Sequence, residues 1–252
     1  MEDFKEFFNS PTYADVSLCF SGHELPAHRL ILTKGSDYFK ALLDSKFRVR
    51  FLHPLFFRAV ILTVSDAQEA NSSFITLQGD SPKALSGMIC TFYGHTAYDK
   101  RTSEASEAGV LQLTYIVDLY VAANKYLVPT LCTQIAADFP VMLEAVKGGP
   151  GYSSNIERLA WHVYDRHATA AEELRKPIVA LITKSIDEWR AAEELGPLLK
   201  GLPEMALDII SAMADVASTV KVGKARKADD EAGHMRVTRA SKRAWLQLAR
   251  RA

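Results

Sequence analysis

Hydrophobic and polar residues alternate along residues 15–20, with Val16, Leu18 and Phe20 on one side. This two-residue period is typical of a strand with one buried face. A Ser21-Gly22 turn follows, and the short run 23–25 then predicts a returning strand. The sequence therefore predicts a β-hairpin, and a further apolar run at 74–77 predicts one more strand of the same small sheet.

The segments around these strands carry apolar residues at helical spacing instead. A short helix is expected over Ala27–Leu32, with Gly35 near its end and Ser36 as the N-cap of the next helix. Proline at the first helical position after Ser81 indicates another helix start. Longer helices are expected at 82–94, at 112–126 and at 129–146, the last with a kink at Pro140.

The Gly- and Pro-rich run at 147–151 is the clearest boundary in the chain. Beyond it, residues 152–214 have helical apolar spacing and predict an all-α extension. Residues 215–252 form a basic tail, expected to be flexible, in which ten basic residues outnumber three acidic ones from Val216 onward. The predicted fold class is α+β: a small β-sheet flanked by a cluster of helices, followed by the all-α C-terminal extension.

Composition excludes several classes of function. Thirty basic and thirty acidic residues cancel, so nucleic acid is an unlikely partner except through the basic tail. The apolar-leaning stretch 47–64 contains several charges, and no membrane partner is expected. The acidic N-terminus differs from a signal peptide, and the three distant cysteines suggest no disulfide framework, so we expect a cytoplasmic or nuclear protein, or one found in both places.

The sequence offers no catalytic, cofactor-binding or metal-ligating residues by motif. It has no nucleotide-binding glycine loop or nucleophile elbow, and no histidines with the i, i+4 spacing typical of a zinc site. His28 and His162 lack any supporting constellation for catalysis. We expect His28 to be a partly buried histidine whose ring nitrogens meet backbone groups, and Tyr120 and Tyr126 to lie in the core.

The ordered set of segments resembles a BTB/POZ domain over residues 11–146, and fungal members in particular. The second half of the resemblance lies in 74–77, in 81–98 and in the Tyr-x-x-Ala-x-Lys-Tyr helix at 120–126. Residues 152–214 are distantly similar to a BACK region. The first half of the resemblance is carried by Asp15, Val16, Ala27, His28, Arg29, Leu32, Ser36, Tyr38 and Phe39.

The resemblance implies a non-enzymatic protein–protein interaction module that forms a homodimer. A short N-terminal helix over residues 1–10 would carry Phe4, Phe7 and Phe8 to the dimer interface, or these rings would simply pack onto the monomer. Asp15 and Arg29 are similar to a charged pair that lines the dimer cleft in related domains. An ordinary structural ion pair is the alternative for these two residues.

Residues 48–68 are an atypical insertion relative to the family pattern. They are either a genuine loop or a retained intron, because removal of Val49–Gln68 is in frame and restores the uninterrupted pattern. That removal also joins Phe47 and Arg48 to Glu69, a triplet similar to the one with which some BTB adaptors contact a cullin. The leading expectation is therefore an interaction module that could serve a cullin-based ubiquitin ligase. The alternative is a nuclear transcription- or chromatin-associated regulator that dimerises through this domain and uses the basic tail for nucleic acid or localisation.

Overall fold

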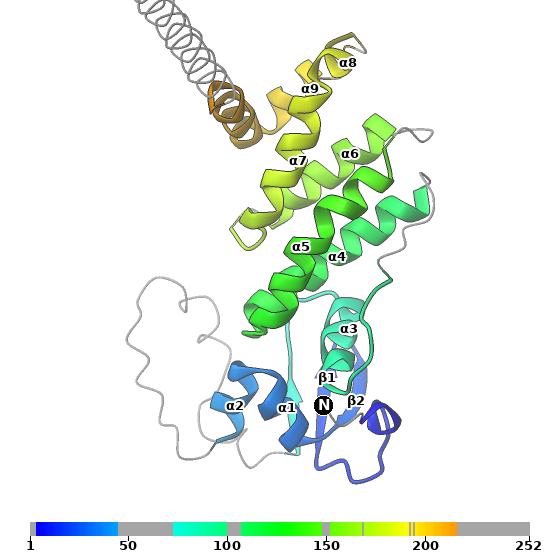
Figure 1. Ribbon diagram of the computed structural model, residues 1–252. Helices are drawn as coiled ribbons and strands as arrows, with labels where there is room; N and C mark the ends of the chain where they lie inside the picture. The colour runs from blue at the N-terminus through cyan, green and yellow to red at the C-terminus, as the bar shows by residue number, and fades with distance from the viewer. Residues whose placement is uncertain are drawn as a thin grey trace, which may run out of the picture. The chain divides into compact units, whose positions relative to one another are not determined.

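The chain is seen here as a computed structural model (Figure 1). No helix in the described part of the chain combines the length and apolar character of a membrane span. The structure describes residues 4–44, 73–99, 107–147, 152–167, 169–191, 193 and 195–215.

A three-stranded sheet of order β2-β1-β3 forms the centre of the N-terminal part. The central strand β1 (Val16–Phe20) pairs antiparallel with β2 (His23–Ala27) and parallel with β3 (Phe74–Thr76). Alternate residues of β1 are buried, as a strand with one covered face requires. The predicted hairpin and the predicted third strand are thus confirmed.

The turn between β1 and β2 explains the tightness of the hairpin. Ser21 and Gly22 both have positive φ angles, of 49° and 78°. A two-residue loop of this kind matches the right-handed twist of the flanking strands, and glycine adopts its second position without steric cost. The hairpin therefore follows from a signal that lies entirely within a few residues of sequence.

Two short helices follow the hairpin, α1 (Arg29–Gly35) and α2 (Asp37–Leu43). The expected start of α1 at Ala27 is wrong, because Ala27 pairs with Val16 in the sheet. Ser36 is the N-cap of α2, as predicted: its hydroxyl accepts a hydrogen bond from the Phe39 N–H at 3.2 Å. The same buried hydroxyl donates to the Tyr126 carbonyl at 2.6 Å and so ties this cap to a distant helix.

A layer of longer helices packs beyond the sheet: α3 (Pro82–Phe92), α4 (Glu107–Lys125) and α5 (Pro129–Ala145). In Figure 1, α4 lies between α3 and α5, and it contacts both. Helix α4 begins five residues before the expected position at Gln112, and α5 continues through Pro140. Tyr120 and Tyr126 are both buried, as predicted.

Lys125, at the end of α4, holds the loop between β3 and α3. Its ammonium group lies 2.6 Å from an Asp80 carboxylate oxygen and donates to the Gln78 carbonyl at 2.8 Å. The Tyr126 hydroxyl donates to the same Asp80 oxygen at 2.9 Å. The three contacts fix the loop that leads into α3 against the C-terminal end of α4.

The chain forms two compact units: the first ends at Leu181 and the second begins at Ile182. The remaining helices are divided between them. The first unit includes α6 (Tyr152–Trp161), the π-helical turn η3 (His162–Arg166) and most of α7 (Glu172–Lys184). Helix α6 packs on α4, so this unit extends well beyond the boundary expected at 147–151. The second unit contains α8 (Ile186–Ala191), α9 (Leu195–Gly201) and a helix over 203–215.

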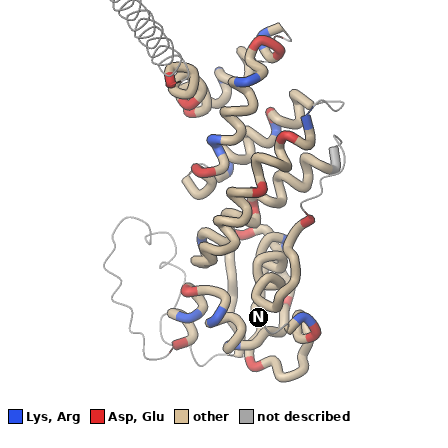
Figure 2. Tube along the Cα trace, viewed as in Figure 1, with Lys and Arg blue, Asp and Glu red and all other residues tan. Residues whose placement is uncertain are grey.

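Basic and acidic residues are scattered along the described part of the chain, as Figure 2 shows. The fully buried side chains of the first unit come from the sheet and from the helices α1 to α7. Among the largest are Leu18, Leu32, Phe39, Ile75, Leu85, Met88, Ile89, Leu113 and Ile116. The residues that match helical or strand periodicity thus form one core in this unit.

Candidate interaction surface

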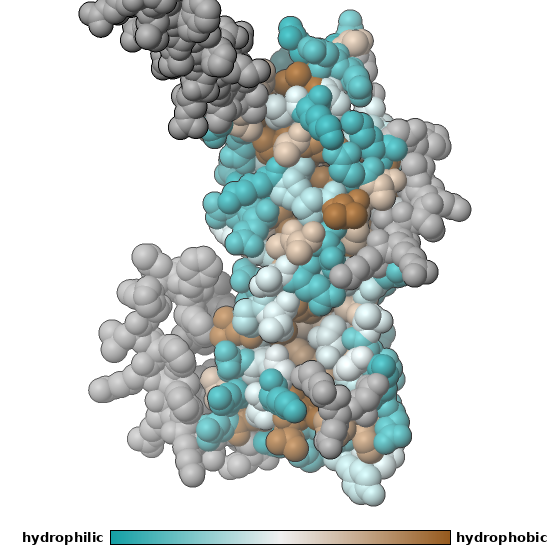
Figure 3. Space-filling view, in the orientation of Figure 1, coloured by the Kyte–Doolittle hydropathy of each residue, from teal (hydrophilic) through white to brown (hydrophobic). Residues whose placement is uncertain are grey.

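A cavity of about 1130 Å³ lies between the N-terminal segment, α1, the end of α3 and the start of α5. Phe4, Phe7 and Asp15, three of the predicted dimer-interface residues, line it. Its volume exceeds the roughly 300–1,000 Å³ of ordinary small-molecule pockets, and it is open. In Figure 3, apolar side chains reach the surface in the region that holds α1. A cavity of this size can also receive side chains of a protein segment.

The N-terminal segment forms one 3₁₀ turn, η1 (Lys5–Phe7), instead of the longer helix expected over residues 1–10, of which 1–3 lie outside the described residues. The Phe7 ring lies 5.8 Å from the His28 ring, and the Phe8 ring lies 5.6 Å from that of Tyr93. Phe7 and Phe8 therefore pack onto their own monomer. Both side chains stay partly exposed, so they can also contact another surface.

His28 is held by hydrogen bonds at both ring nitrogens. Nε2 lies 2.9 Å from the Thr12 carbonyl oxygen and therefore carries the proton, while Nδ1 lies 2.9 Å from the Tyr93 hydroxyl and accepts from it. The His28 backbone N–H donates to the same hydroxyl at 3.1 Å. Burial raises the pKa of Tyr93 to about 12, so the hydroxyl stays protonated. The predicted backbone contact is thus found for Nε2, whereas Nδ1 meets a side-chain hydroxyl instead.

Asp15 caps helix α1. Its carboxylate accepts a hydrogen bond of 2.8 Å from the backbone N–H of Arg29, the first residue of the helix. The negative charge lies at the positive end of the helix dipole, which stabilises the helix start. Asp15 therefore contacts Arg29 through its backbone N–H. The predicted charged pair at a dimer cleft, and the alternative of a structural ion pair, stay predictions.

These observations agree with a comparison to known families. A family model for the BTB/POZ domain matches residues 4–140, more than half of the 252-residue chain. The chain belongs to the BTB/POZ family. No curated protein matches the chain in a sequence search. BTB domains are protein–protein interaction modules, and the small mixed sheet with its cover of helices is consistent with that fold.

The surface of this BTB domain exposes apolar side chains beside the cavity. Leu30, in the first turn of α1, is 78% exposed, and Tyr13 is 83% exposed. Both line the cavity together with Lys34 of α1. Apolar side chains that remain in water beside an open groove mark a surface suited to binding a partner.

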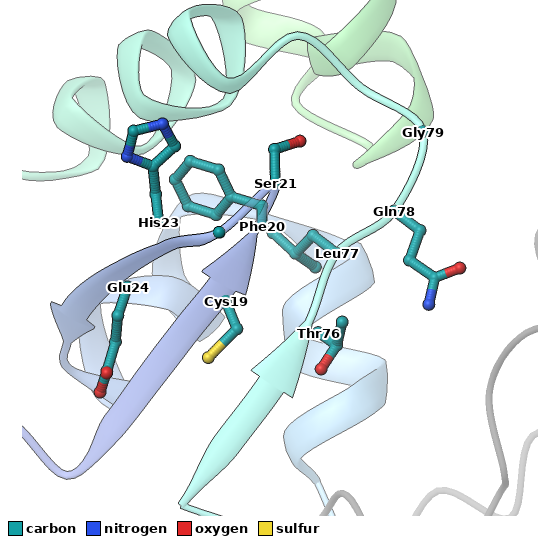
Figure 4. A pocket seen from close by; sticks show the side chains of 10 residues that line it. Cys19, Phe20, Ser21, His23, Glu24, Thr76, Leu77, Gln78 and Gly79 are labelled. Carbon is teal, nitrogen blue, oxygen red and sulfur yellow. The ribbon is translucent and has the colours of Figure 1, made fainter.

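A second hollow of about 450 Å³ lies beside the hairpin turn of the BTB domain and the residues that follow β3 (Figure 4). His23 and Glu24 both line it, yet their side chains point away from each other in Figure 4. The Cys19 sulfur also points away from the imidazole. The ten residues that line this hollow therefore present no paired acid and base.

Two thiols of the BTB domain, those of Cys90 and Cys132, are poorly suited to nucleophilic chemistry. Burial raises the pKa of Cys90 to about 11, and burial together with the nearby Glu173 raises the pKa of Cys132 to about 11. At neutral pH only roughly one thiol in ten thousand is then ionised, and the thiolate is the nucleophile. These two cysteines pack as small apolar groups, as their isolated positions in the sequence predict.

Three of the predicted site residues belong to a part that the structure does not cover. Phe47, Arg48 and Glu69, the candidate cullin contacts, lie outside the described residues, as does the insertion at 48–68. The same holds for the basic tail from Val216 onward. The predictions about them therefore stay predictions.

The structure also brings together a cluster that the sequence did not indicate. It consists of Asp118 of α4, His162 at the start of η3 and His167, the residue after η3. One Asp118 oxygen lies 2.8 Å from His162 Nε2 and 3.0 Å from His167 Nε2. Burial alone would raise the pKa of Asp118, but the hydrogen bonds from both imidazoles outweigh it and hold that pKa well below its usual value. The five-residue spacing of the histidines is not that of a regular helical pair, so no sequence pattern indicates this cluster.

Proposed function

We propose that this BTB domain forms a homodimer through the α1 surface, which we define as Phe4, Phe7, Tyr13, Leu30 and Lys34. The observation that supports it is the open cavity of about 1130 Å³ that these five residues line. Leu30 and Tyr13 project beside it, almost fully exposed. The family adds a reason to choose a second copy as the occupant, because BTB domains mediate self-association.

Physical chemistry favours a twofold arrangement. In such an interface the same patch occurs on both copies, so an acidic and a basic residue on it pair with each other across the axis. The cavity is lined by Asp15 and Lys34, one of each sign. Burial of Leu30 in both copies would contribute about 1.5–3 kcal/mol per side chain to the dimer. The zero formal net charge of the chain adds no long-range repulsion.

We further propose that the dimer is an adaptor for a cullin-based ubiquitin ligase, of the fungal type and with residues 152–214 as a BACK-like extension. The support is the sequence: joining Phe47 and Arg48 to Glu69 gives a triplet similar to that of cullin-binding relatives. The basic tail supports a second candidate, a nuclear regulator that contacts nucleic acid through residues 215–252. Either protein would act in the cytoplasm, the nucleus or both.

The dimer is tested by the mass of the full chain in solution. Light scattering after size exclusion is expected to give twice 27.9 kDa for the wild-type chain. Leu30→Asp places a charge on the α1 surface without entering the core, and we expect it to give the monomer mass. Val141→Asp is the matched control, because Val141 is also an exposed aliphatic residue, at 70%, but lies on α5 away from the cavity.

The dimer proposal fails if Leu30→Asp and Val141→Asp have the same mass as the wild type. Circular dichroism of both variants checks that each substitution leaves the helices intact. A monomeric wild-type chain over the micromolar range would refute the proposal directly.

The finer proposals need separate assays. Affinity purification of the full chain beside a deletion of Val49–Gln68 is expected to recover a cullin with the deletion. Recovery of no cullin by either form would reject the adaptor. Binding of duplex DNA that weakens with salt and is lost on truncation at Val216 would support the regulator, because phosphate contacts are salt-dependent. Absence of any such binding would reject it.

A further inference from the structure

The Asp118 cluster is built on an irregular helical turn. Residues five apart on an α-helix lie about 140° apart around the axis, since each residue turns by about 100°. His162 and His167 nevertheless converge on one oxygen, because η3 (His162–Arg166) is a π-helical turn. Because a π-helical turn is wider than an α-helical one, His167, the residue after η3, returns to the side of the helix on which His162 lies. Such turns occur mostly as single turns inside α-helices, and they are frequent at functional sites.

We propose that Asp118, His162 and His167 bind a divalent transition-metal ion, with Zn²⁺ as the best-fitting candidate. One carboxylate oxygen and two imidazole nitrogens form a ligand set that zinc takes in proteins, with a fourth position left for water. Imidazole ligands select late transition metals over Mg²⁺ and Ca²⁺, which prefer oxygen. The site goes beyond the proposed dimer and adaptor and does not depend on them.

The three ligand atoms are close enough to share one ion. They all lie within 4.8 Å of one another. Tetrahedral zinc with bonds of about 2.0–2.1 Å separates its ligand atoms by roughly 3.3 Å. The Asp118 oxygen lies 2.8 Å and 3.0 Å from the two Nε2 atoms, so each pair would open by a few tenths of an ångström to admit the ion. Small side-chain rotations supply that movement.

The protonation of the two imidazoles and the solvent exposure of the cluster are also compatible with a bound metal ion. Each ring offers Nε2 to the carboxylate, so the metal would replace the Nε2 proton and each neutral ring would carry its proton on Nδ1. The side chains of Asp118, His162 and His167 are 19%, 14% and 17% exposed. They are thus buried enough to be held in place and open enough for an ion to enter and for a water to complete the coordination.

The location gives the ion a structural role. Asp118 lies within residues 4–140, which match the BTB domain, whereas both histidines lie beyond them in the helical extension. Both parts belong to one compact unit, and η3 contacts α4. A bound ion would therefore join the extension to the BTB domain through α4. Because metal bound only by the folded state stabilises it, zinc is expected to raise the melting temperature.

The test is zinc binding to the full chain, prepared without a histidine tag and stripped with a chelator. Calorimetric titration with Zn²⁺ is expected to give one site per chain and a melting temperature that rises with zinc but not with Mg²⁺. His167→Gln removes one ligand, and we expect affinity to fall by more than the roughly 10- to 100-fold that loss of an outer-shell partner costs. His167→Cys keeps a ligand atom and is expected to retain binding.

The matched control is His23→Gln, which removes an exposed histidine of β2 and is expected to bind zinc like the wild type. The inference is overturned if the wild-type chain takes up no stoichiometric zinc, or if His162→Gln with His167→Gln binds zinc as well as His23→Gln does. If the double variant does not fold, X-ray absorption of zinc-loaded wild-type chain decides. Two imidazole ligands and one carboxylate are expected, and any sulfur ligand would contradict the site.

Discussion

The buried hydroxyl of Ser36 offers the sharpest test of how the BTB domain is held together. It accepts from the Phe39 N–H at 3.2 Å and donates to the Tyr126 carbonyl at 2.6 Å, and Ser36 is only 3% exposed. Ser36→Ala removes both hydrogen bonds without adding volume. Loss of an N-cap costs about 0.5–2 kcal/mol, and a buried group left without its partner costs about 1–3 kcal/mol.

Because one hydroxyl makes both bonds, the two costs overlap, and we expect the free energy of unfolding to fall by about 2–3 kcal/mol. Urea unfolding followed by circular dichroism measures this. With a slope of about 1–3 kcal/mol per molar urea, the midpoint falls by roughly 1 M or more. Ser10→Ala is the control, since the Ser10 hydroxyl accepts a 3.3 Å hydrogen bond at the exposed surface. A loss for Ser36→Ala no larger than that of Ser10→Ala would refute the reasoning.

Three further outcomes follow from the contacts of the domain. Tyr93→Phe leaves the histidine at the start of α1 without its hydroxyl partner, and urea unfolding should show a loss of about 1–3 kcal/mol. Cys90 and Cys132 should react with a maleimide much more slowly than a free thiol at pH 8, because burial raises both pKa values to about 11. The reaction should become faster as the pH approaches 11, and mass spectrometry would follow the labelling. Gly35→Ala would drive a methyl group into the Phe92 ring, and a thermal melt should show destabilisation of about 1–3 kcal/mol.

The elements predicted correctly are those whose signal is local. The hairpin depends on the alternation of Val16, Leu18 and Phe20 and on the Ser-Gly turn that follows, all within residues 16–22. Ser36 is likewise a cap whose partner lies three residues away. In such cases the period of burial and the chemistry of the turn act at short range, so the sequence alone contains them.

The features that were missed depend on contacts between distant residues. Asp118 and His162 are 44 positions apart, and nothing in the sequence around either one indicates the other. A π-helical turn then places His167 beside His162, against the rule that helical neighbours lie three or four apart. The start of α1 was misplaced for a similar reason: Ala27 fits a helix by local pattern, but pairing with Val16 draws it into the sheet.

The predicted boundary at 147–151 lies inside the first compact unit, and this bears on function. The glycines and the proline at 147–151 predict an interruption of secondary structure. Such an interruption does not by itself mean that the segments on its two sides pack into separate units. Tyr120 of α4 donates to Glu173 of α7 at 3.2 Å, and Asp118 contacts His162 of η3 and His167 just after it. The side of α4 that carries these groups is therefore covered by the extension. A partner that binds the BTB domain has to use other surfaces, and the open cavity beside α1, whose lining ends at Gln134, is one that the extension leaves accessible.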